Sequence, residues 1–348
     1  MGIISRSSRI VVAGLLILCM ALLASGCGLG KMARERQAAQ GGPVELKLAY
    51  HLPVDHHLSK SIERFAAEVN ERSGGSIIIK TYPAGQLYTD KSMNDAIMSG
   101  GLDMGLNSTA MWTTVIPALN VLDVPFLLPN YDSVAKAIDG SLGRTLTTEM
   151  ERKGVHPVIW ADYGFVQFAN NKRPLKKPED FQGLQLRGYG QIPAETIKAL
   201  GASPVTMGSG EVYMAMQRGT IDGQTSGTTA MYDRKMYEVS KYLTMTNHAF
   251  CEFVLAMNGS AWDRLTEEQR QLIESVAAEI RDEIRQETKA EDLKTTQELQ
   301  AAGMEVYEIP ANEIPLWQEA TKSVREGFVR STGDIGKQLV QQCLAANQ

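Results

Sequence analysis

The feature that most constrains the fold is an alternation of short strand patterns with amphipathic helix patterns, which occurs twice along the chain. The first series predicts a strand, helix, strand, helix and strand over residues 44–52, 58–75, 76–85, 90–101 and 102–108. In the first helix the apolar residues recur at helical spacing, and Gly74 ends the pattern. Such alternation is typical of an α/β protein with a parallel sheet.

A second series has the same rhythm. Its predicted strands are 156–164, 184–190, 203–207 and 221–227, and its helices are 191–201 and 210–219. Two α/β halves suggest two lobes that face a crevice. Because ligands of such sheets bind beyond the carboxyl ends of the strands, the loops after Tyr50 and Leu106 are candidate walls of that crevice.

A long helix is expected after the second half. Thr266 and Gln269 have the spacing of a capping box, and helical spacing then runs towards Ala302 before Gly303. At 1.5 Å per residue this helix is on the order of 50 Å long, which outreaches one small domain. We therefore predict that it lies across both lobes, with a further helix over residues 311–331 packing on it.

The N-terminus has the composition of an export signal. Arg6 and Arg9 precede an uncharged apolar run over 10–24, so we predict a signal peptide over 1–26. The segment LLASGC resembles a bacterial lipobox, with Ala24 in place of the usual leucine, and this predicts lipidation of Cys27. The alternative is an ordinary signal peptide with an incidental cysteine. If Cys27 is lipidated, residues 27–43 are predicted to be the lipidated cysteine and a flexible tether, and the lipid holds the protein to a membrane surface.

Composition excludes some partners. The chain has 348 residues, a formal net charge of -5 and 43% hydrophobic residues. This length is sufficient for two domains. The mild acidity argues against a nucleic-acid partner, and no segment after residue 30 is apolar enough to cross a membrane. Cys251 and Cys343 remain once the signal has left; a disulfide between them is possible outside the cytoplasm, but we expect them to be unpaired.

Several motifs together resemble the solute-binding proteins of tripartite ATP-independent periplasmic (TRAP) transporters, the DctP-like family. The most specific are the PEDxxGLxxR block at 178–187, GASP at 201–204 and EVYxAxQxGxxDG at 211–223. The resemblance implies the two-lobed α/β fold of periplasmic binding proteins of the class II type, with lobes 44–164 plus 250–292 and 165–249 plus 293–348. It also implies a periplasmic or extracytoplasmic protein that captures a small organic acid and delivers it to TRAP permease membrane subunits.

Arg187 is the central candidate for ligand binding. It stands where the strand of GLQLRGYG ends, and the family resemblance implies that this arginine pairs with the carboxylate of the transported acid. A planar guanidinium offers two parallel donors to a carboxylate, which gives direction as well as energy. The alternative is a solvated arginine beside a turn that the flanking glycines make possible.

Two departures from the family pattern bear on the ligand. Val166 stands where many relatives have a second arginine, and Thr225 and Ser226 replace an acid and an amide. The second clamp is therefore expected to be weaker or absent, with hydroxyls on the opposite wall. We expect a monocarboxylate whose tail meets apolar or aromatic groups. Candidates for that contact are Phe165, Trp112 and Tyr189. Gln167, in the same region as Phe165, is a further candidate for ligand binding.

Other residues leave alternatives open. His51, with His56 and His57, could line the cleft, lie in a solvated loop or bind metal, but no acidic or cysteine cluster completes a metal site, so none is expected. Tyr213 could face the cleft or not, and Trp112 could equally belong to the core. The segment GYGQIPAE is a broken dinucleotide fingerprint, so no cofactor is expected.

No catalytic residue is expected, because the sequence has neither G-x-S-x-G nor H-E-x-x-H and no obvious nucleophile beside a base. Two rival functions stay open. The chain could be an exported enzyme acting on organic acids, which a catalytic base beside Arg187 would favour. It could also be a binding protein that presents its ligand to a sensor.

Overall fold

A mixed sheet runs through residues 42–348, the part of the chain that this computed structural model describes. The strand order is β2–β1–β3–β8–β4–β7–β5–β6, and β9 pairs with β8. The strands are β1 (Val44–Tyr50), β2 (Ile77–Tyr82), β3 (Met104–Ser108), β4 (Val155–Asn170), β5 (Gln185–Gly188), β6 (Ser203–Thr206), β7 (Gly223–Gly227), β8 (Tyr242–Asn258) and β9 (Glu305–Glu308). The predicted signal peptide, Cys27 and most of the tether lie outside the described residues.

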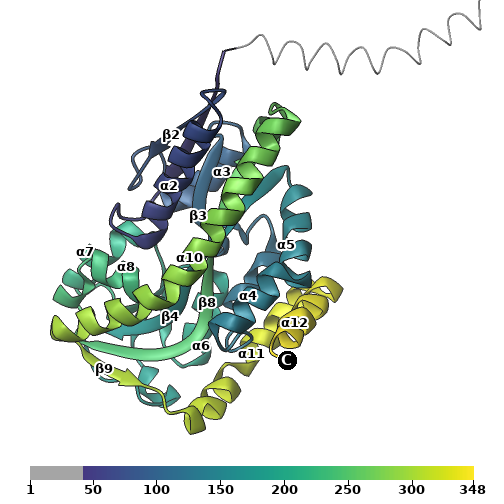
Figure 1. Cartoon of the computed structure of the whole chain (residues 1–348). Coiled ribbons are helices and arrows are strands. Elements are labelled where there is room, and N and C mark those ends of the chain that lie inside the picture. Colours follow the sequence, from purple (N-terminus) through teal and green to yellow (C-terminus); the bar gives the residue numbers. More distant parts are fainter. Residues whose placement is uncertain (1–41) are drawn as a thin grey trace, which may run out of the picture. The chain divides into compact units, whose positions relative to one another are not determined.

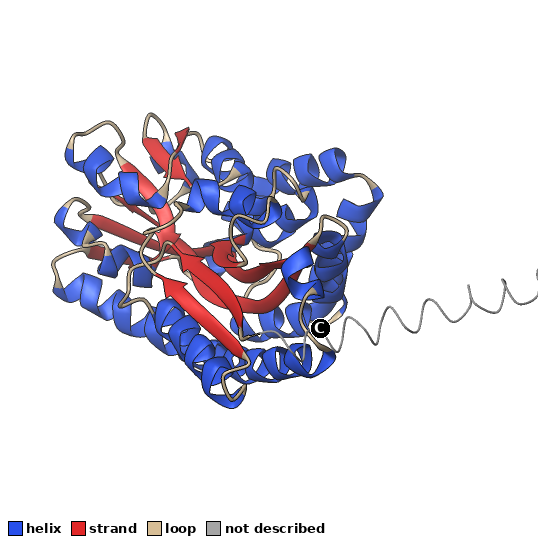
Figure 2. Ribbon diagram, turned by 90° about the horizontal axis from the view of Figure 1, so that it is seen from above, coloured by secondary structure: helices blue, strands red, loops and turns tan. Residues whose placement is uncertain are grey.

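Helices lie on both sides of the strands, as Figure 2 shows. They are α2 (His57–Arg72), α3 (Asp90–Met98), α4 (Tyr131–Asp139), α5 (Ser141–Glu151), α6 (Gln191–Ala199), α7 (Val212–Gln217), α8 (Thr228–Asp233), α9 (Gly259–Asp263), α10 (Glu267–Ala301), α11 (Ile314–Thr332) and α12 (Asp334–Ala346). Two 3-10 helices, η1 (Thr109–Trp112) and η2 (Pro117–Asp123), follow β3. Each strand and helix predicted from the two alternating series is present.

Two long strands join the parallel halves of the sheet. β1 pairs with β3 in parallel, as β5 does with β6 and β7, whereas β4 and β8 run antiparallel to each other over most of their lengths. β8 was not predicted, and β4 extends beyond the predicted end at residue 164. The register of the pair shifts at Gly164, whose φ of 123° favours glycine.

The long helix α10 confirms the prediction of a capped helix beyond residue 266. Thr266 Oγ1 accepts the Gln269 N–H at 3.2 Å, and Gln269 Oε1 accepts the Thr266 N–H at 3.0 Å. Figure 1 shows α10 running along the body of the protein, where it packs on α2, β4 and α8. Because α2 and α8 belong to different predicted lobes, α10 contacts both of them. The boundaries of the lobes stay a prediction.

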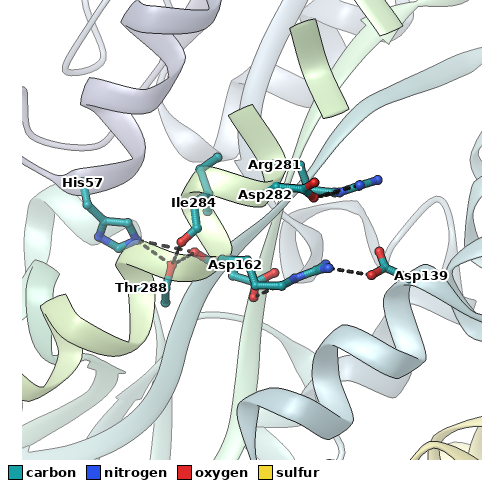
Figure 3. Close-up of polar contacts among 8 residues, drawn as sticks. His57, Asp139, Asp162, Arg281, Asp282, Ile284 and Thr288 are labelled. Carbon is teal, nitrogen blue, oxygen red and sulfur yellow. Dashed lines mark hydrogen bonds and ion pairs between the residues drawn. The ribbon is translucent and has the colours of Figure 1, made fainter. Parts of the chain in front are cut away.

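Polar contacts fix α10 to its neighbours (Figure 3). Thr288 Oγ1 on α10 donates to the carbonyl oxygen of Asp162 on β4 at 2.9 Å, and His57 Nε2 on α2 lies 3.4 Å from the same oxygen. Arg285 Nη1 also donates to the Asp139 carboxylate of α4 at 2.6 Å. The helix is therefore tied to a strand and to two other helices near the middle of the sheet.

Two expectations about the body concern its cysteines and its hydropathy. Cys251 and Cys343 are buried, and the structure shows no disulfide between them. Within residues 42–348, none of the helices is long and apolar enough to span a membrane.

Candidate ligand-binding site

A cavity of about 50 Å³ lies where several strands end, on the side where parallel α/β sheets bind ligands. Its lining comes from the ends of β1, β3, β5 and β7 and from the crossing strands β4 and β8. The lining residues are His51, Leu52, Asp90, Asn107, Ser108, Met111, Tyr163, Val166, Arg187, Tyr189, Ser209, Gln224, Ser226, Ala230, Arg234, Cys251 and Phe253. Of the residues singled out from the sequence, Arg187, Tyr189, His51 and Ser226 meet here.

Arg187 is buried at the end of β5, with 4% of its surface exposed. Its Nε donates to the carbonyl oxygen of Met207 at 3.2 Å, and its Nη1 donates to that of Thr225 at 3.4 Å. Among residues 42–348, no carboxylate oxygen lies within 4.0 Å of its guanidinium nitrogens. Burial lowers the pKa of the guanidinium from its ordinary value. Two backbone carbonyls thus orient a buried positive charge that lacks an ion-pair partner within residues 42–348.

Tyr189 lies beside this guanidinium and is itself held by a buried acid. The Arg187 guanidinium carbon lies 5.7 Å from the centroid of the Tyr189 ring. The Tyr189 hydroxyl donates to Asp123 Oδ1 at 2.7 Å. Burial raises the pKa of Asp123 to about 7. The backbone of Gly190 is extended. A Cβ atom at this position would lie 3.0 Å from the Cβ atom of Ala110, so the glycine lets the two segments approach closely.

A second guanidinium, that of Arg234, lines the cavity from the residue after α8. Its Nη2 donates to the carbonyl oxygen of His51 at 3.4 Å, and burial lowers its pKa. The expectation of a weak or absent second clamp rested on Val166 and on Thr225 and Ser226, and it did not consider Arg234. Val166 does line the cavity without a charge, but Arg234 brings a positive charge from another element.

Asp90, the first residue of α3, contributes a carboxylate to the same cavity. Its Oδ1 accepts the Lys91 N–H at 3.0 Å and its Oδ2 accepts the Ser209 N–H at 2.9 Å. Burial opposes ionisation, but the charges of His51 and Arg187 and the Ser209 N–H hold the pKa of Asp90 below its ordinary value. The sequence analysis missed Asp90 and Arg234. Asp90 has the position of a residue that begins a helix, and Arg234 does not stand directly at the end of a predicted strand.

The remaining lining is aromatic and hydroxylic. Tyr163 stacks on Phe253 with ring centroids 4.8 Å apart, and the His51 ring stacks on Phe253 with centroids 5.8 Å apart. The Tyr163 and Ser226 hydroxyl oxygens lie 3.2 Å apart. Burial lowers the pKa of His51 to about 4, so this imidazole is neutral at neutral pH. Besides its charged groups, the cavity lining therefore offers flat apolar surface and neutral polar groups.

Five residues proposed from the sequence lie outside the cavity lining, and three of these, Trp112, Phe165 and Tyr213, make their contacts elsewhere in the fold. Trp112 is fully buried in the apolar core, and its neighbour Met111 reaches the cavity. Phe165 packs edge-on against Phe250 at 5.1 Å in the same core. Tyr213 donates to Glu238 Oε2 at 2.5 Å in a part-exposed position on α7.

Two further candidates brace the strands around the cavity. Gln167 Oε1 accepts the backbone N–H groups of Thr246 and Asn247 at 2.7 and 3.0 Å, which bridges an irregularity between β4 and β8. Thr225 accepts a hydrogen bond from Arg187 through its carbonyl oxygen, and its buried hydroxyl has no hydrogen-bond partner in the described part of the chain. Both therefore lie beside the cavity, and their part in ligand binding stays a prediction.

The histidines after β1 have local partners. His56 Nδ1 accepts the Leu58 N–H at 3.2 Å and so caps α2, while His57 contacts the backbone of β4. No group of three or more His, Cys, Asp or Glu side chains that could hold a metal ion occurs in the described part of the chain.

Comparison with known proteins identifies the family of this chain. A sequence model of the bacterial extracellular solute-binding proteins of family 7, DctP, matches residues 48–331. The C4-dicarboxylate-binding periplasmic protein DctP of Rhodobacter capsulatus is 30% identical over 84% of this chain and 88% of its own.

Solved structures agree with the sequence match. A TRAP periplasmic solute-binding protein of Sulfitobacter sp. NAS-14.1 with bound β-D-galacturonate superposes with a TM-score of 0.83 and 26% identity, covering 86% of this chain and 99% of that one. One of Ralstonia eutropha with bound (S)-2-acetolactate has a TM-score of 0.80 and 28% identity, with coverages of 87% and 98%. The α/β architecture is thus that of the two-lobed TRAP binding proteins, and this chain belongs to family 7 of the bacterial extracellular solute-binding proteins, the DctP family of TRAP transporters.

Proposed function

We propose that this chain is an exported lipoprotein, anchored through Cys27, that captures a small monocarboxylate outside the cytoplasmic membrane and delivers it to TRAP permease subunits. The family consists of periplasmic solute-binding proteins that serve transport, which supports the capture of an organic acid. Similar proteins hold acids as different as galacturonate and acetolactate, so the choice of acid depends on this chain's own cavity.

The observation that carries the proposal is the buried, unpaired guanidinium of Arg187. A buried charge without a partner is costly, and a ligand carboxylate in a water-poor cavity would compensate it with two parallel hydrogen bonds. Met207 and Thr225 hold Nε and Nη1 through their carbonyl oxygens, which fixes the plane of the guanidinium. The ligand carboxylate would take the donors that face the cavity.

The charge of the cavity favours a single carboxylate on the ligand. Arg187 and Arg234 bring two positive charges and Asp90 one negative charge, while His51 is neutral at neutral pH. The ionised lining groups therefore leave one positive charge unbalanced. A monocarboxylate balances it, whereas a dicarboxylate would leave an excess negative charge in a buried site.

Closure of two lobes over the acid would complete the site. We place the lobes at residues 44–164 plus 250–292 and 165–249 plus 293–348. In this arrangement Arg187 and Ser226 come from the second lobe, and His51 and Asp90 come from the first. A ligand that touches both groups would select the closed state, because only that state forms all contacts at once.

The cavity gives no support to the rival function of an exported enzyme. Asp90 does lie in the same cavity as Arg187, but its pKa is held below the ordinary value, and the pKa of His51 is lowered to about 4. A general base works best with a pKa near the operating pH, so both groups are weak bases.

A thermal-shift screen of the purified, ligand-free protein tests the proposal. The panel contains keto, hydroxy, sugar and aromatic monocarboxylic acids and dicarboxylic acids. An acid at about a hundred times its dissociation constant adds roughly 2.7 kcal/mol to the free energy of unfolding, which is easily seen as a shift. We expect monocarboxylates to raise the midpoint and Arg187→Ala to abolish the rise.

The matched control is Arg264→Ala, since Arg264 is exposed and pairs with Asp103 on the surface. This variant should keep the full ligand-induced shift. A shift that survives Arg187→Ala, or one seen with dicarboxylates alone, contradicts the proposal.

A further inference from the structure

Two buried carboxyl groups, those of Asp162 and Glu252, lie beneath α10 and outside the lining of the ligand cavity. Asp162 on β4 is paired directly with Glu252 on β8 in the antiparallel register. The side chains of such a pair point to the same face of the sheet, with their Cβ atoms about 5 Å apart. Their exposed fractions are only 1% and 0%. The two acids therefore share one water-poor site.

One cation lies beside this pair of acids. Arg285 Nε on α10 lies 3.7 Å from Asp162 Oδ2, while Arg285 Nη1 donates to Asp139 on α4 at 2.6 Å (Figure 3). Among residues 42–348, no Lys, Arg or His nitrogen lies within 4.0 Å of a Glu252 carboxylate oxygen. Asp139 is half-exposed and keeps its contact with water. If both buried acids ionise, one positive charge therefore faces two buried negative charges.

The hydrogen bonding of the pair is incomplete. All four carboxylate oxygens of Asp162 and Glu252 lack a hydrogen-bond donor in the part of the chain that the structure describes. Buried polar atoms in proteins nearly always have a partner, so these four acceptors need an explanation. Two ionised carboxylates cannot hydrogen bond to each other, because both only accept. A proton on one of them supplies the missing donor and removes one of the two negative charges.

The surrounding groups favour Glu252 as the holder of that proton. The charged and titratable side chains that face the pair are Arg281 and Arg285 of α10, Asp139 and Tyr131 of α4, His57 of α2 and Cys251 of β8. Burial lowers the pKa of His57 to about 4 and raises those of Tyr131 and Cys251, so these three groups are neutral at neutral pH. Burial raises the pKa of Asp162 to about 6 against the opposing charge of Arg285. Burial and the charge of Asp162 raise the pKa of Glu252 well above its ordinary value.

We propose that Asp162 and Glu252 hold one proton between them at neutral pH and form a proton-binding site beneath α10. The proton resides on Glu252, whose carboxyl group donates a hydrogen bond to the Asp162 carboxylate. Asp162 then remains as the single buried anion beside Arg285. The proton thus balances the charges where α10 packs on the two long strands. Because neither acid lines the ligand cavity, this site is independent of the proposed function.

Infrared spectroscopy of the purified protein tests the site, because a protonated carboxylic acid has a C=O stretching band separate from the bands of carboxylates. The other acids with pKa values raised to about 6 or 7 are Asp123, Asp233 and Asp292. At about pH 8 these acids are largely ionised, so we expect one remaining carboxylic acid band. Glu252→Gln should lose this band. The matched control Glu268→Gln, at an exposed position on α10, should keep it.

The pH at which the band disappears shows whether the two acids share the proton. In Asp162→Asn the neighbouring negative charge is gone and Arg285 can attract Glu252, so the midpoint should fall by about 1–3 pH units. Arg285→Gln removes the attracting charge, so the midpoint should rise. Circular dichroism checks that each variant is folded, and either variant alone decides the question. A midpoint equal to that of the unchanged protein would mean that burial alone holds the proton, which overturns the shared site.

Denaturant unfolding at several pH values gives an independent test. The unfolded glutamate has a pKa of about 4.3, so the unfolded state loses a proton that the folded state keeps. The stabilisation from this proton is complete below about pH 4 and is lost as the pH rises towards the folded pKa. From about pH 5 to about pH 8, the unfolding equilibrium constant of the unchanged protein should rise about tenfold per pH unit relative to that of Glu252→Gln. A ratio that stays constant with pH, or the absence of the infrared band at about pH 8, overturns the proposal.

Discussion

Asp123 is a buried carboxyl that touches the site only through Tyr189. Its Oδ1 accepts a hydrogen bond from the Tyr189 hydroxyl, and its Oδ2 has no hydrogen-bond partner among residues 42–348. Tyr189 and Cys251 are the titratable groups that sense its charge, and the pKa values of both are raised, mainly by burial. Because ionised Asp123 is poorly solvated there, burial raises its pKa to about 7.

This raised pKa predicts a pH dependence of stability. The unfolded value is about 3.9, so the folded state holds a proton that the unfolded state loses between about pH 4 and about pH 7. The stabilisation from Asp123 is therefore complete below about pH 4 and is lost as the pH rises to about 7, on the order of 1 kcal/mol per pH unit. Denaturant unfolding of the protein and of Asp123→Asn at several pH values measures the difference. A difference that stays constant with pH would contradict the assignment.

Gly164 is the residue where β4 bends beneath α10. Its φ is 123°, and a Cβ there would lie 2.5 Å from Asp292 Oδ2, which accepts the Phe165 N–H at 3.2 Å. Gly164→Ala should therefore lower the free energy of unfolding through both backbone strain and this clash, by on the order of 3 kcal/mol.

The matched control for the bend is Gly154→Ala. Gly154 also has a positive φ, of 73°, but a Cβ there meets nothing within 4 Å. It should show the conformational cost alone, about 1 kcal/mol. Equal losses of stability in the two variants would show that the contact with Asp292 is not restrictive.

At the scale of elements, the capping box of α10 gives a direct prediction. Thr266→Ala removes the acceptor of the Gln269 N–H and should lower the free energy of unfolding by about 1 kcal/mol. Thr266→Ser keeps the hydroxyl and should be close to neutral. Chemical denaturation of the three proteins checks this, and an equal effect of both substitutions would mean that the cap is not responsible.

The same scale shows what the sequence could predict. The α10 cap was readable because its signal lies within four consecutive residues, 266–269. β8 was missed because its residues are nearly all buried, so apolar and polar residues do not alternate along it. Trp112 and Met111 are neighbours, and only packing decides that the methionine reaches the cavity.

A site residue could be predicted where a local sequence pattern marked it. Arg187 follows a strand pattern and ends a specific motif, and the structure places it in the cavity. Asp90 and Arg234 reach that cavity only because the fold brings the start of α3, which follows β2, near the end of α8, which follows β7. Their spacing of more than 140 residues carries no local signal.

At the scale of the whole molecule, the sheet brings the binding groups together. β1, β3, β5 and β7 all end at the cavity, and the crossing pair β4 and β8 forms its floor with Tyr163 and Phe253. α10 packs on segments of both proposed lobes, so it is positioned to keep them associated while the cavity opens and closes. Under the proposed function, the net positive charge of the cavity lining attracts the carboxylate of the acid.

The most direct measurement of the central claim is a crystal structure of the protein with the acid that gives the largest thermal shift. The account predicts the acid's carboxylate on the Arg187 guanidinium, with two parallel hydrogen bonds of about 2.7–2.9 Å. A carboxylate bound elsewhere, with Arg187 still bonded only to the carbonyl oxygens of Met207 and Thr225, would contradict it.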